Sequence, residues 1–215
     1  MDRRRGVVAV EKHPQEVDYF ASKASDYESE KRRVDNVDAI AGEIVRRVHL
    51  DRKMHIADFG SGTGLLLKRL APFVSRITAI DRSVSMNGVL RASIDEIECE
   101  VEIVECDIEV DPPSHIFDGI VSSMTMHHIG DIDALFRTFY DMLRPGGFIA
   151  LADLDSEDGT FHTVDTGVRH HGFDREWISR KAREAGFANV EISDASVVEK
   201  PYGLYPVFLL TGERP

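Results

Sequence analysis

Hydrophobic residues first recur at helical spacing in the segment 34–48, VDNVDAIAGEIVRRV. A repeat of three to four residues places side chains on one face of an α-helix. The apolar positions that fit this repeat are Val34, Val37, Ile40, Ala41, Ile44, Val45 and Val48. The charged residues fall on the other face, so the pattern predicts an amphipathic helix that packs against an element further along the chain.

Short apolar runs then alternate with segments of helical spacing. The runs predict strands at 54–59, 76–81, 101–107, 117–123 and 147–153. Between them the spacing predicts helices at 65–72, 83–92 and 131–143. We expect Pro145-Gly146-Gly147 to stop the last of these helices.

The C-terminal part predicts one more helix at 174–186, ended by Gly186, and two strands at 188–193 and 205–212. No long helix separates the two strands, so we expect them to pair as antiparallel neighbours. Compact apolar strands that alternate with helices are typical of an α/β fold, with a parallel sheet covered by helices on both faces. For 215 residues we expect a single domain.

In such sheets ligands bind at the carboxyl ends of the strands, so the residues that follow each strand are the ones to examine. The first strand runs into DFGSGTG, which places glycines at positions 60, 62 and 64. Glycines at alternate positions let the backbone turn tightly and approach a ligand closely. A dinucleotide fingerprint needs Gly or Ala at the next position, so Leu65 disfavours a dinucleotide.

An acidic residue follows each of the next two predicted strands. Asp81 ends the second strand, where a carboxylate can accept hydrogen bonds from a ribose diol. Asp107 ends the third strand, where a carboxylate can accept a hydrogen bond from an amino group such as adenine N6, and Ile108 can cover an adenine face. A glycine-rich loop and two acids at successive strand ends together predict a nucleoside-binding site.

These motifs resemble those of class I S-adenosylmethionine (SAM)-dependent methyltransferases. ADFGSGTG is similar to the first motif of that family, AID contains its ribose acid, ECD its adenine acid, and MLRPGG the turn before its fifth strand. The overall pattern is closest to the small-molecule branch that includes ubiquinone and menaquinone C-methyltransferases. The resemblance implies a Rossmann-like fold with a seven-stranded, mostly parallel sheet, an antiparallel last strand inserted beside the fifth, and helices on both faces.

The resemblance also implies the cofactor site and the division of the chain. The cofactor is SAM, the product is S-adenosylhomocysteine, and no metal is expected. The residues implied to bind the cofactor are Asp58, Gly60, Ser61, Gly62, Gly64, Asp81, Arg82, Met86, Asp107, Ile108, Ser123 and Met124. Within a single methyltransferase domain, 1–215, we expect a helical cap at 1–50, a SAM-binding core at 51–153, an acceptor-side insertion at 154–173, and the final helix and strand pair at 174–215.

Composition restricts the partners. The formal net charge is −12, which argues against a nucleic-acid backbone as the main partner because phosphate binding needs clustered Lys and Arg. No apolar run reaches about 18 residues, so no membrane span is expected. Cys99 and Cys106 are not in a CxxC spacing, and we interpret them as reduced thiols in a cytoplasmic protein.

Two motifs suggest other chemistry. Asp111-Pro112-Pro113-Ser114 is similar to the signature of amino-group methyltransferases, but it precedes the fourth strand and ends in Ser, so we interpret it as a turn. His127-His128 look like metal ligands, yet adjacent residues rarely converge on one ion. We expect one of this pair to line the pocket and the other to pack behind it.

The segment 158–174, DGTFHTVDTGVRHHGFD, is expected to cross the mouth of the cofactor cleft. Asp174 is positioned to cap the helix that begins at residue 175. The remaining candidates to line the acceptor pocket are His162, His170, His171, Asp153, Asp155 and Glu157. One of the histidines, or His127, is the expected group that orients or deprotonates the acceptor; a solvated polar loop is the alternative.

In the N-terminal segment, Phe20 and Tyr27 are predicted either to close over the cofactor or to fix the first helix on the sheet. The expected function is methyl transfer to a small-molecule acceptor by direct in-line displacement. A general base is required only if the acceptor must lose a proton. The alternatives are a methyltransferase that acts on a protein or RNA, a non-catalytic SAM-binding protein and a dinucleotide-dependent oxidoreductase.

Overall fold

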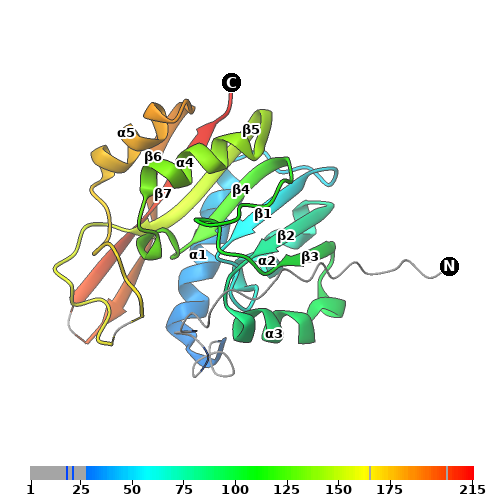
Figure 1. Ribbon diagram of the computed structural model, residues 1–215. Helices are drawn as coiled ribbons and strands as arrows, with labels where there is room; N and C mark the ends of the chain where they lie inside the picture. Colours follow the sequence, from blue (N-terminus) through cyan, green and yellow to red (C-terminus); the bar gives the residue numbers. More distant parts are fainter. Residues whose placement is uncertain (1–17, 19–20, 22–27, 165, 202) are drawn as a thin grey trace.

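The computed structural model describes residues 18, 21, 28–164, 166–201 and 203–215, which form an α/β domain around one sheet (Figure 1). The sheet has seven strands in the order β3-β2-β1-β4-β5-β7-β6. Their bounds are β1 His55–Phe59, β2 Arg76–Ile80, β3 Glu100–Val104, β4 Phe117–Ser123, β5 Leu143–Leu154, β6 Ala188–Lys200 and β7 Gly203–Glu213.

Strand direction follows the expected fold. The pairs β1–β2, β1–β4, β2–β3 and β4–β5 are parallel, whereas β7 is antiparallel to both β5 and β6. The last strand is therefore inserted between the fifth and the sixth, and the prediction of a seven-stranded sheet with an antiparallel final strand is confirmed. Because the order reverses at β1 and β4, the carboxyl ends of these two strands flank the crevice where ligands bind.

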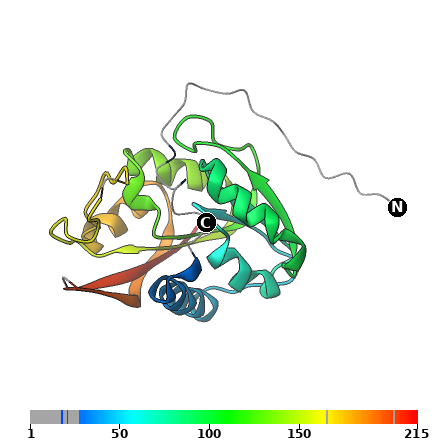
Figure 2. The same ribbon diagram turned by 90° about the horizontal axis from the view of Figure 1, so that it is seen from below.

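Helices cover both faces of the sheet, as the two perpendicular views show (Figure 2). Buried side chains of α1, α2 and α3 share one hydrophobic core with one face, and those of α4 and α5 share a second core with the other. The helix bounds are α1 Lys31–Arg47, α2 Leu65–Leu70, α3 Val84–Ala92, α4 Ile132–Asp141 and α5 Arg175–Glu184. Short 3₁₀ helices add η2 Ala71–Phe73, η3 Ile94–Glu96 and η4 Met126–His128.

Several boundaries differ from the sequence prediction; the largest shift is in β6, which continues to Lys200 instead of ending at residue 193. Strand β3 ends at Val104, three residues early, so Asp107 lies in the turn after the strand. Helix α4 ends at Asp141, before the Pro-Gly-Gly turn, because Leu143 already pairs with Phe117 of β4. The glycine pair therefore lies inside the irregular start of β5, and the prediction that it stops the helix was wrong.

Helix α1 is amphipathic as expected, but its buried face includes a charge. Glu43 is only 4% exposed; it accepts hydrogen bonds from Arg47 Nε at 2.7 Å and from Ser193 Oγ of β6 at 3.1 Å. Val45, which was assigned to the apolar face, is instead 37% exposed, because it lies one helical step beyond the buried Ile44. The predicted packing on a later element is confirmed, since the partners of α1 are α2 and the C-terminal strand pair.

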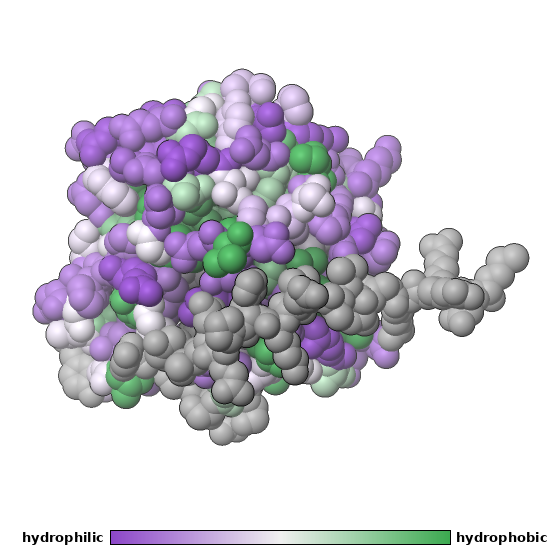
Figure 3. Space-filling model, in the orientation of Figure 1, coloured by the Kyte–Doolittle hydropathy of each residue, from purple (hydrophilic) through white to green (hydrophobic). Residues whose placement is uncertain are grey.

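The face of the molecule in Figure 3 is mainly hydrophilic, and hydrophobic side chains show there mostly near the middle. Among the described residues, no helix combines the length and the apolar character that crossing a bilayer requires.

Candidate active site

A cavity of about 400 Å³ lies at the carboxyl ends of β1, β2 and β4. The loops that follow these strands and the turn after β3 form one part of its wall, and residues of the segment 161–166 form another. All residues that the sequence assigns to the cofactor line this cavity, with Gly64 as the exception. Of the four candidate catalytic histidines, His127 and His162 line it, and His170 and His171 do not.

In the glycine-rich loop, Gly62 is the position where the backbone faces open space. A Cβ atom built on Gly62, where φ is +55°, meets no atom within 4 Å. A Cβ on Gly60 would lie 2.1 Å from Thr125 Oγ1, so this glycine permits close packing of the loops after β1 and β4. Gly64 precedes α2, and a Cβ there would lie 2.6 Å from Leu90 Cδ1. Gly62 therefore serves ligand approach, while the other two serve the fold.

Asp58, the penultimate residue of β1, lines the cavity and is 1% exposed. Burial, followed by the nearby charge of Asp81, raises the pKa of Asp58 to about 8, against a lowering contribution from the backbone N–H of Leu67. Within the described part of the chain, Asp58 Oδ2 has no hydrogen-bond partner, and neither do the buried hydroxyls of Ser61 and Thr63. These groups fit a ligand that carries an amino group and further polar atoms at this end of the cavity.

Asp81 fastens the glycine-rich loop to the end of β2. Its carboxylate accepts one hydrogen bond from the backbone N–H of Gly62 and one from that of Ser83, both at 2.8 Å. Burial raises the pKa of Asp81, and the two backbone donors oppose this shift. Because both donors lie on the cavity wall, the carboxylate fixes their positions around any ligand.

The next wall combines a charge pair with apolar side chains. Arg82 Nη1 lies 3.3 Å from Asp107 Oδ2, and the other carboxylate oxygen of Asp107 accepts a hydrogen bond from the backbone N–H of Glu109 at 2.9 Å. Met86 and Ile108 are buried and line the same cavity. This part of the lining therefore combines apolar side chains with the Asp107 carboxylate.

The loop after β4 brings a strained residue to the cavity. Met124 adopts φ of +59°, which is uncommon for a residue with a side chain, and its N–H donates to Ala152 O at 2.9 Å. Ser123 precedes it, and within the described residues its buried Oγ has no hydrogen-bond partner. Both residues line the cavity between the glycine-rich loop and the histidines.

His127 is the most buried histidine of the site, at 1% exposure. Its Nδ1 lies 2.7 Å from Oδ1 of Asp153, and its backbone N–H donates to Oδ2 of the same carboxylate at 3.2 Å. Asp153 is the penultimate residue of β5 and is fully buried. Within the described residues, Nε2 of His127 is buried without a hydrogen-bond partner, and His127 is one of the residues that line the cavity.

Two more imidazole rings lie beside His127. The centroids of His128 and His162 are 4.3 and 5.1 Å from that of His127. Burial, followed by the neighbouring histidines, lowers the pKa of His128 to about 4 and that of His162 to about 3, so both are neutral near pH 7. The expectation that only one member of the His127-His128 pair lines the pocket was wrong, because both do.

The other histidines of the segment 158–174 are used elsewhere. His170 Nε2 lies 2.9 Å from the backbone oxygen of Ile129, and the ring packs against Phe173. The side chain of His171 is 64% exposed, with Nδ1 at 3.4 Å from Glu157 Oε1. Asp174 accepts a hydrogen bond from Trp177 N at 2.7 Å, which confirms its prediction as the N-cap of α5.

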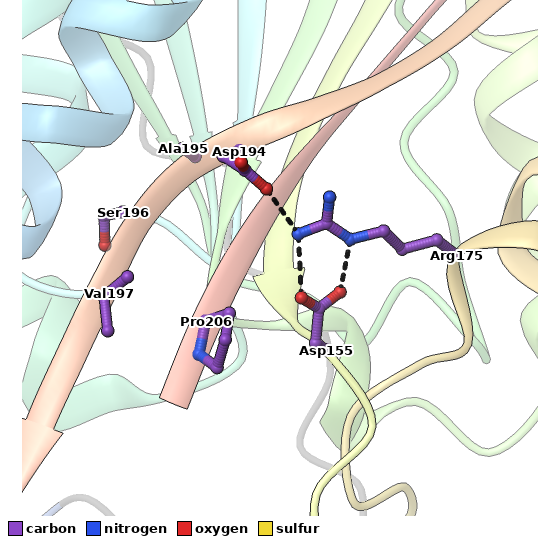
Figure 4. A pocket seen from close by; sticks show the side chains of 7 residues that line it. All are labelled: Asp155, Arg175, Asp194, Ala195, Ser196, Val197 and Pro206. Atoms are coloured by element: carbon purple, nitrogen blue, oxygen red, sulfur yellow. Dashed lines mark hydrogen bonds and ion pairs between the residues drawn. The ribbon is translucent and has the colours of Figure 1, made fainter. Parts of the chain in front are cut away.

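A second hollow lies beside the C-terminal strands and is lined by Asp155, Arg175 and Asp194 (Figure 4). Arg175 donates to both carboxylate oxygens of Asp155 at 2.7 Å, and its Nη2 lies 2.8 Å from Asp194 Oδ1. These carboxylates raise the pKa of Arg175. These three charged side chains are paired with one another. The hollow is therefore best explained as an ion-pair network that links the segment after β5 to α5 and to β6.

Described residues of the predicted N-terminal cap also line the cavity: Asp18, Glu30, Arg32, Arg33, Asn36 and Val37. Asp18 lines the cavity and accepts hydrogen bonds from Ser83 Oγ at 3.0 Å and from Ser85 Oγ at 2.7 Å. Phe20 and Tyr27, the predicted lid residues, lie outside the described residues. The sequence offered no motif for Asp18 or Thr166, which line the cavity from two separate segments.

Within the residues that the structure describes, no group of three or more His, Cys, Asp or Glu side chains is arranged to hold a metal ion. This includes the three clustered imidazoles, whose geometry is that of packed rings at centroid distances from 4.3 to 5.9 Å.

Residues 30–192 match the family described as "Methyltransferase domain". The chain belongs to this family. The match covers most of the sequence, and together with the sheet order it confirms the resemblance to class I SAM-dependent methyltransferases. The methyltransferase assignment thus rests on the sequence family and on the strand order independently.

Named relatives of this methyltransferase differ in their acceptors. An uncharacterised methyltransferase of Schizosaccharomyces pombe is 31% identical over 156 residues, covering 65% of this chain and 55% of the relative. Phosphoethanolamine N-methyltransferase 1 of Zea mays is 29% identical over 161 residues, covering 71% and 32%. Ubiquinone biosynthesis O-methyltransferase of Xanthomonas campestris is 28% identical over 119 residues, covering 54% and 49%. The chain therefore spans about half or less of the length of these relatives.

Solved structures share the fold of this methyltransferase at low sequence identity. The methyltransferase in complex with the Trm112 activator of Haloferax volcanii matches with a TM-score of 0.73 and 17% identity, over 95% of this chain and all of that one. Phosphoethanolamine N-methyltransferase 2 of Haemonchus contortus, in complex with S-adenosyl-L-methionine, matches with a TM-score of 0.66 and 17% identity, over 88% of this chain and 59% of that one. At this identity the likeness concerns the fold.

Proposed function

We propose that the protein transfers the methyl group of SAM to a small-molecule acceptor and releases S-adenosylhomocysteine. The observation that carries the proposal is the composition of the cavity at the carboxyl ends of β1, β2 and β4. Its lining combines Gly62 and Asp58, with the unsatisfied carboxyl oxygen of Asp58, and the histidine cluster of His127, His128 and His162. We infer that the first group serves the methyl donor and the second the acceptor.

The residues present suit SAM. Asp58 would accept from the amino group of its methionine part, Asp81 would position the loop beside the ribose, and Met86, Asp107 and Ile108 would hold the adenine. When bound, SAM supplies a methyl group already activated by the sulfonium. The protein is then required to align the acceptor, exclude water and accept any proton that the acceptor loses.

A small acceptor is favoured by three observations. The cavity volume of about 400 Å³ is in the range of pockets that enclose small ligands. The net charge of −12 disfavours a nucleic-acid partner. The named activities among the relatives concern phosphoethanolamine and a ubiquinone precursor pathway, which are small-molecule processes. A protein or RNA acceptor and a non-catalytic SAM-binding role are the outcomes that the test must separate from this proposal.

The test has two stages. Isothermal calorimetry with SAM, S-adenosylhomocysteine and NAD first identifies the cofactor class, with Gly62→Arg as the variant whose side chain fills the open approach. We expect the wild type to bind SAM and S-adenosylhomocysteine, and the variant to lose at least about 100-fold in affinity. Binding of NAD without SAM would overturn the proposal.

The second stage measures S-adenosylhomocysteine formation across phenols, amines, thiols and quinols. We expect turnover with at least one class in the wild type and none in Gly62→Arg. Circular dichroism of the variant separates a blocked cleft from a misfolded chain. SAM binding with no turnover in this panel, but with turnover on protein or RNA, would replace the acceptor class and leave the cofactor assignment intact.

A further inference from the structure

We propose that the acceptor carries an oxyanion, a carboxylate or a phosphate group, and that Lys200 binds this group with Arg32 and Arg33 beside it. The inference rests on the proposed function and deepens it, because it names the chemical feature by which the site would select its substrate. All three basic residues line the cavity, and none of them is among the residues implied to bind the cofactor.

The three basic residues lie together although they come from distant parts of the chain. Arg32 and Arg33 belong to the first turn of α1, and Lys200 is the last residue of β6. Arg32 Nη1 donates to the backbone oxygen of Glu199 at 3.2 Å, which joins the two segments. Burial lowers the pKa of Lys200, and the charges of Arg32 and Arg33 add to this shift against the opposing charge of Glu30. A ligand anion would stabilise an ammonium in such surroundings.

Negative charge on this side of the cavity does not match the positive charge. The carboxylate of Glu30 lies 3.5 Å from Arg32 and 2.9 Å from Arg33. In the described part of the chain Lys200 forms no ion pair; its Nζ donates to the backbone oxygen of Phe161 and lies 3.5 Å from the centroid of the Phe161 ring. Three basic side chains beside one carboxylate form a positive group on a chain whose net charge is −12. Arg and Lys are the side chains that bind carboxylate and phosphate groups most strongly.

A neutral hydrogen-bonding group lies next to the ammonium. Lys200 and His162 both contact Phe161, since the centroid of the His162 ring is 4.8 Å from that of Phe161, and the charge of Lys200 acts on His162. Nδ1 of His162 lies 3.2 Å from Oγ1 of Thr166, and among the described residues its buried Nε2 has no hydrogen-bond partner. When the threonine hydroxyl donates to Nδ1, the proton of the neutral ring lies on Nε2, which can donate to an oxyanion.

Apolar side chains connect the basic residues with the cofactor residues. Phe161, Val198, Val37 and Leu66 line the cavity and belong to the same hydrophobic cluster as Met124, which is implied to bind the cofactor. We therefore expect the oxyanion to be attached to a frame with an apolar part. Charge would then hold one end of the acceptor and apolar contacts its frame, so that its reactive atom meets the methyl group in a fixed position.

A binding experiment tests the oxyanion without measuring turnover. Benzoate and phenyl phosphate are titrated by calorimetry into the complex with S-adenosylhomocysteine, and benzamide serves as the uncharged analogue of similar shape. We expect the wild type to bind at least one of the two anions about 10-fold or more tightly than benzamide. The comparison of the two anions distinguishes a carboxylate from a phosphate acceptor.

Lys200→Gln should weaken binding of the preferred anion by about 10-fold or more, because it removes the charge while its amide can still donate to Phe161 O. The affinities for benzamide and S-adenosylhomocysteine should stay at the wild-type values. Lys200→Arg should restore anion binding, and Arg33→Gln should weaken it through a residue that does not contact Phe161.

Lys53→Gln is the matched control, because Lys53 is exposed and does not line the cavity; its affinities should equal those of the wild type. Failure of both anions to bind, or equal affinity for the anions and benzamide, would overturn the inference. Unchanged anion binding in Lys200→Gln would overturn the role of Lys200, and so would an equal loss of S-adenosylhomocysteine affinity, because the effect would then be on the fold.

Kinetics give the second readout. With an anionic acceptor that is turned over, Lys200→Gln should raise KM by about 10-fold or more and leave kcat nearly unchanged, because the oxyanion is held equally in the ground state and the transition state. An equal rise in KM for the amide of the same acceptor would contradict recognition of charge. If the wild type binds SAM but methylates only uncharged acceptors, the oxyanion inference fails and the proposed function stands. If SAM does not bind, the proposed function itself fails.

Discussion

At the cofactor end of the cavity, the polar groups are carried on the ends of neighbouring parallel strands. Asp58 is the penultimate residue of β1, and Asp81 directly follows β2; the two strands are paired in register through Phe59 and Ile80. At the histidine end, His127 comes from η4, Asp153 from the end of β5, and His162 from a loop. The first end is positioned by the sheet itself, whereas the second is assembled from three segments that meet only in the folded protein.

This difference has an energetic side. The cofactor end holds a carboxylate that is unsatisfied until a ligand arrives, so the empty protein bears the cost of burying it. At the histidine end, Asp153 is surrounded by donors, and the atoms without a partner among the described residues are imidazole nitrogens, Nε2 of His127 and of His162. In the protein without ligand, the cofactor end therefore lowers the free energy of unfolding more than the histidine end does, and ligand binding removes this cost.

The sharpest test of this comparison is Asp58→Asn. The amide has the same shape but cannot ionise, so SAM affinity should fall by about 10- to 100-fold, since the amino group of SAM would lose a charge-assisted hydrogen bond to a carboxyl that ionises when SAM binds. Calorimetry measures this loss, with Asp38→Asn, on the exposed face of α1, as the control. Unchanged affinity would show that the unsatisfied oxygen of Asp58 does not face the ligand.

The same variant should be more stable than the wild type without ligand. The folded-state pKa of about 8 lies above the ordinary 3.8, so between these values the folded protein binds a proton that the unfolded chain does not. Ionisation of Asp58 therefore lowers the free energy of unfolding of the wild type as the pH rises from 3.8 to about 8. Urea unfolding at pH 9 should show Asp58→Asn stabilised by about 1–3 kcal/mol, with the difference fading toward pH 4; a destabilised variant at pH 9 would contradict the argument.

A smaller effect is expected from His162 at the other end. Its folded-state pKa of about 3 lies below 6.5, so the unfolded chain binds the proton first and stability is lost as the pH falls from 6.5 toward 3. In His162→Asn this loss should shrink by roughly 1–2 kcal/mol between pH 7 and pH 4, allowing for partial exposure. Chemical unfolding across this range measures it, and parallel curves for both proteins would place the acid sensitivity elsewhere.

The smallest effect should come from the hollow outside the cavity. Arg175→Gln removes an ion pair that is partly exposed, so the free energy of unfolding should fall by no more than about 1 kcal/mol. SAM affinity should stay at the wild-type value, because Arg175 does not line the cavity. A large loss of SAM affinity would mean that the ion pair between Arg175 and Asp155 influences the geometry of the cofactor end.

The contrast between the two ends also explains what the sequence could predict. Glycines and acids next to apolar runs are local signals, so the cavity lining from Asp58 to Ile108 could be assigned without coordinates. The contact of His127 with Asp153 spans 26 residues and depends on where β5 ends, and nothing local marks it. For the same reason His162, His170 and His171 looked alike in the sequence, although the fold places the first in the cavity and the others outside it.

Helix α1 gives the same lesson away from the site. Its apolar repeat correctly predicted an amphipathic helix, but a repeat counts hydrophobic residues and does not detect a charge that finds donors across the interface. Glu43 is buried because Ser193 of β6 and Arg47 of its own helix satisfy it, and Ser193 lies 150 residues away.

The insertion of β7 has a consequence for water. In the register of the sheet, Asp153 of β5 pairs with Phe208 of β7, and both side chains are fully buried. Without this strand, β5 would be an open edge, and the carboxylate that orients His127 would be hydrated and weakened as an electrostatic partner. No residue of β7 lines the cavity, yet through Phe208 this strand keeps water away from Asp153. The C-terminal strand pair therefore influences the reactivity of the histidine end as well as the fold.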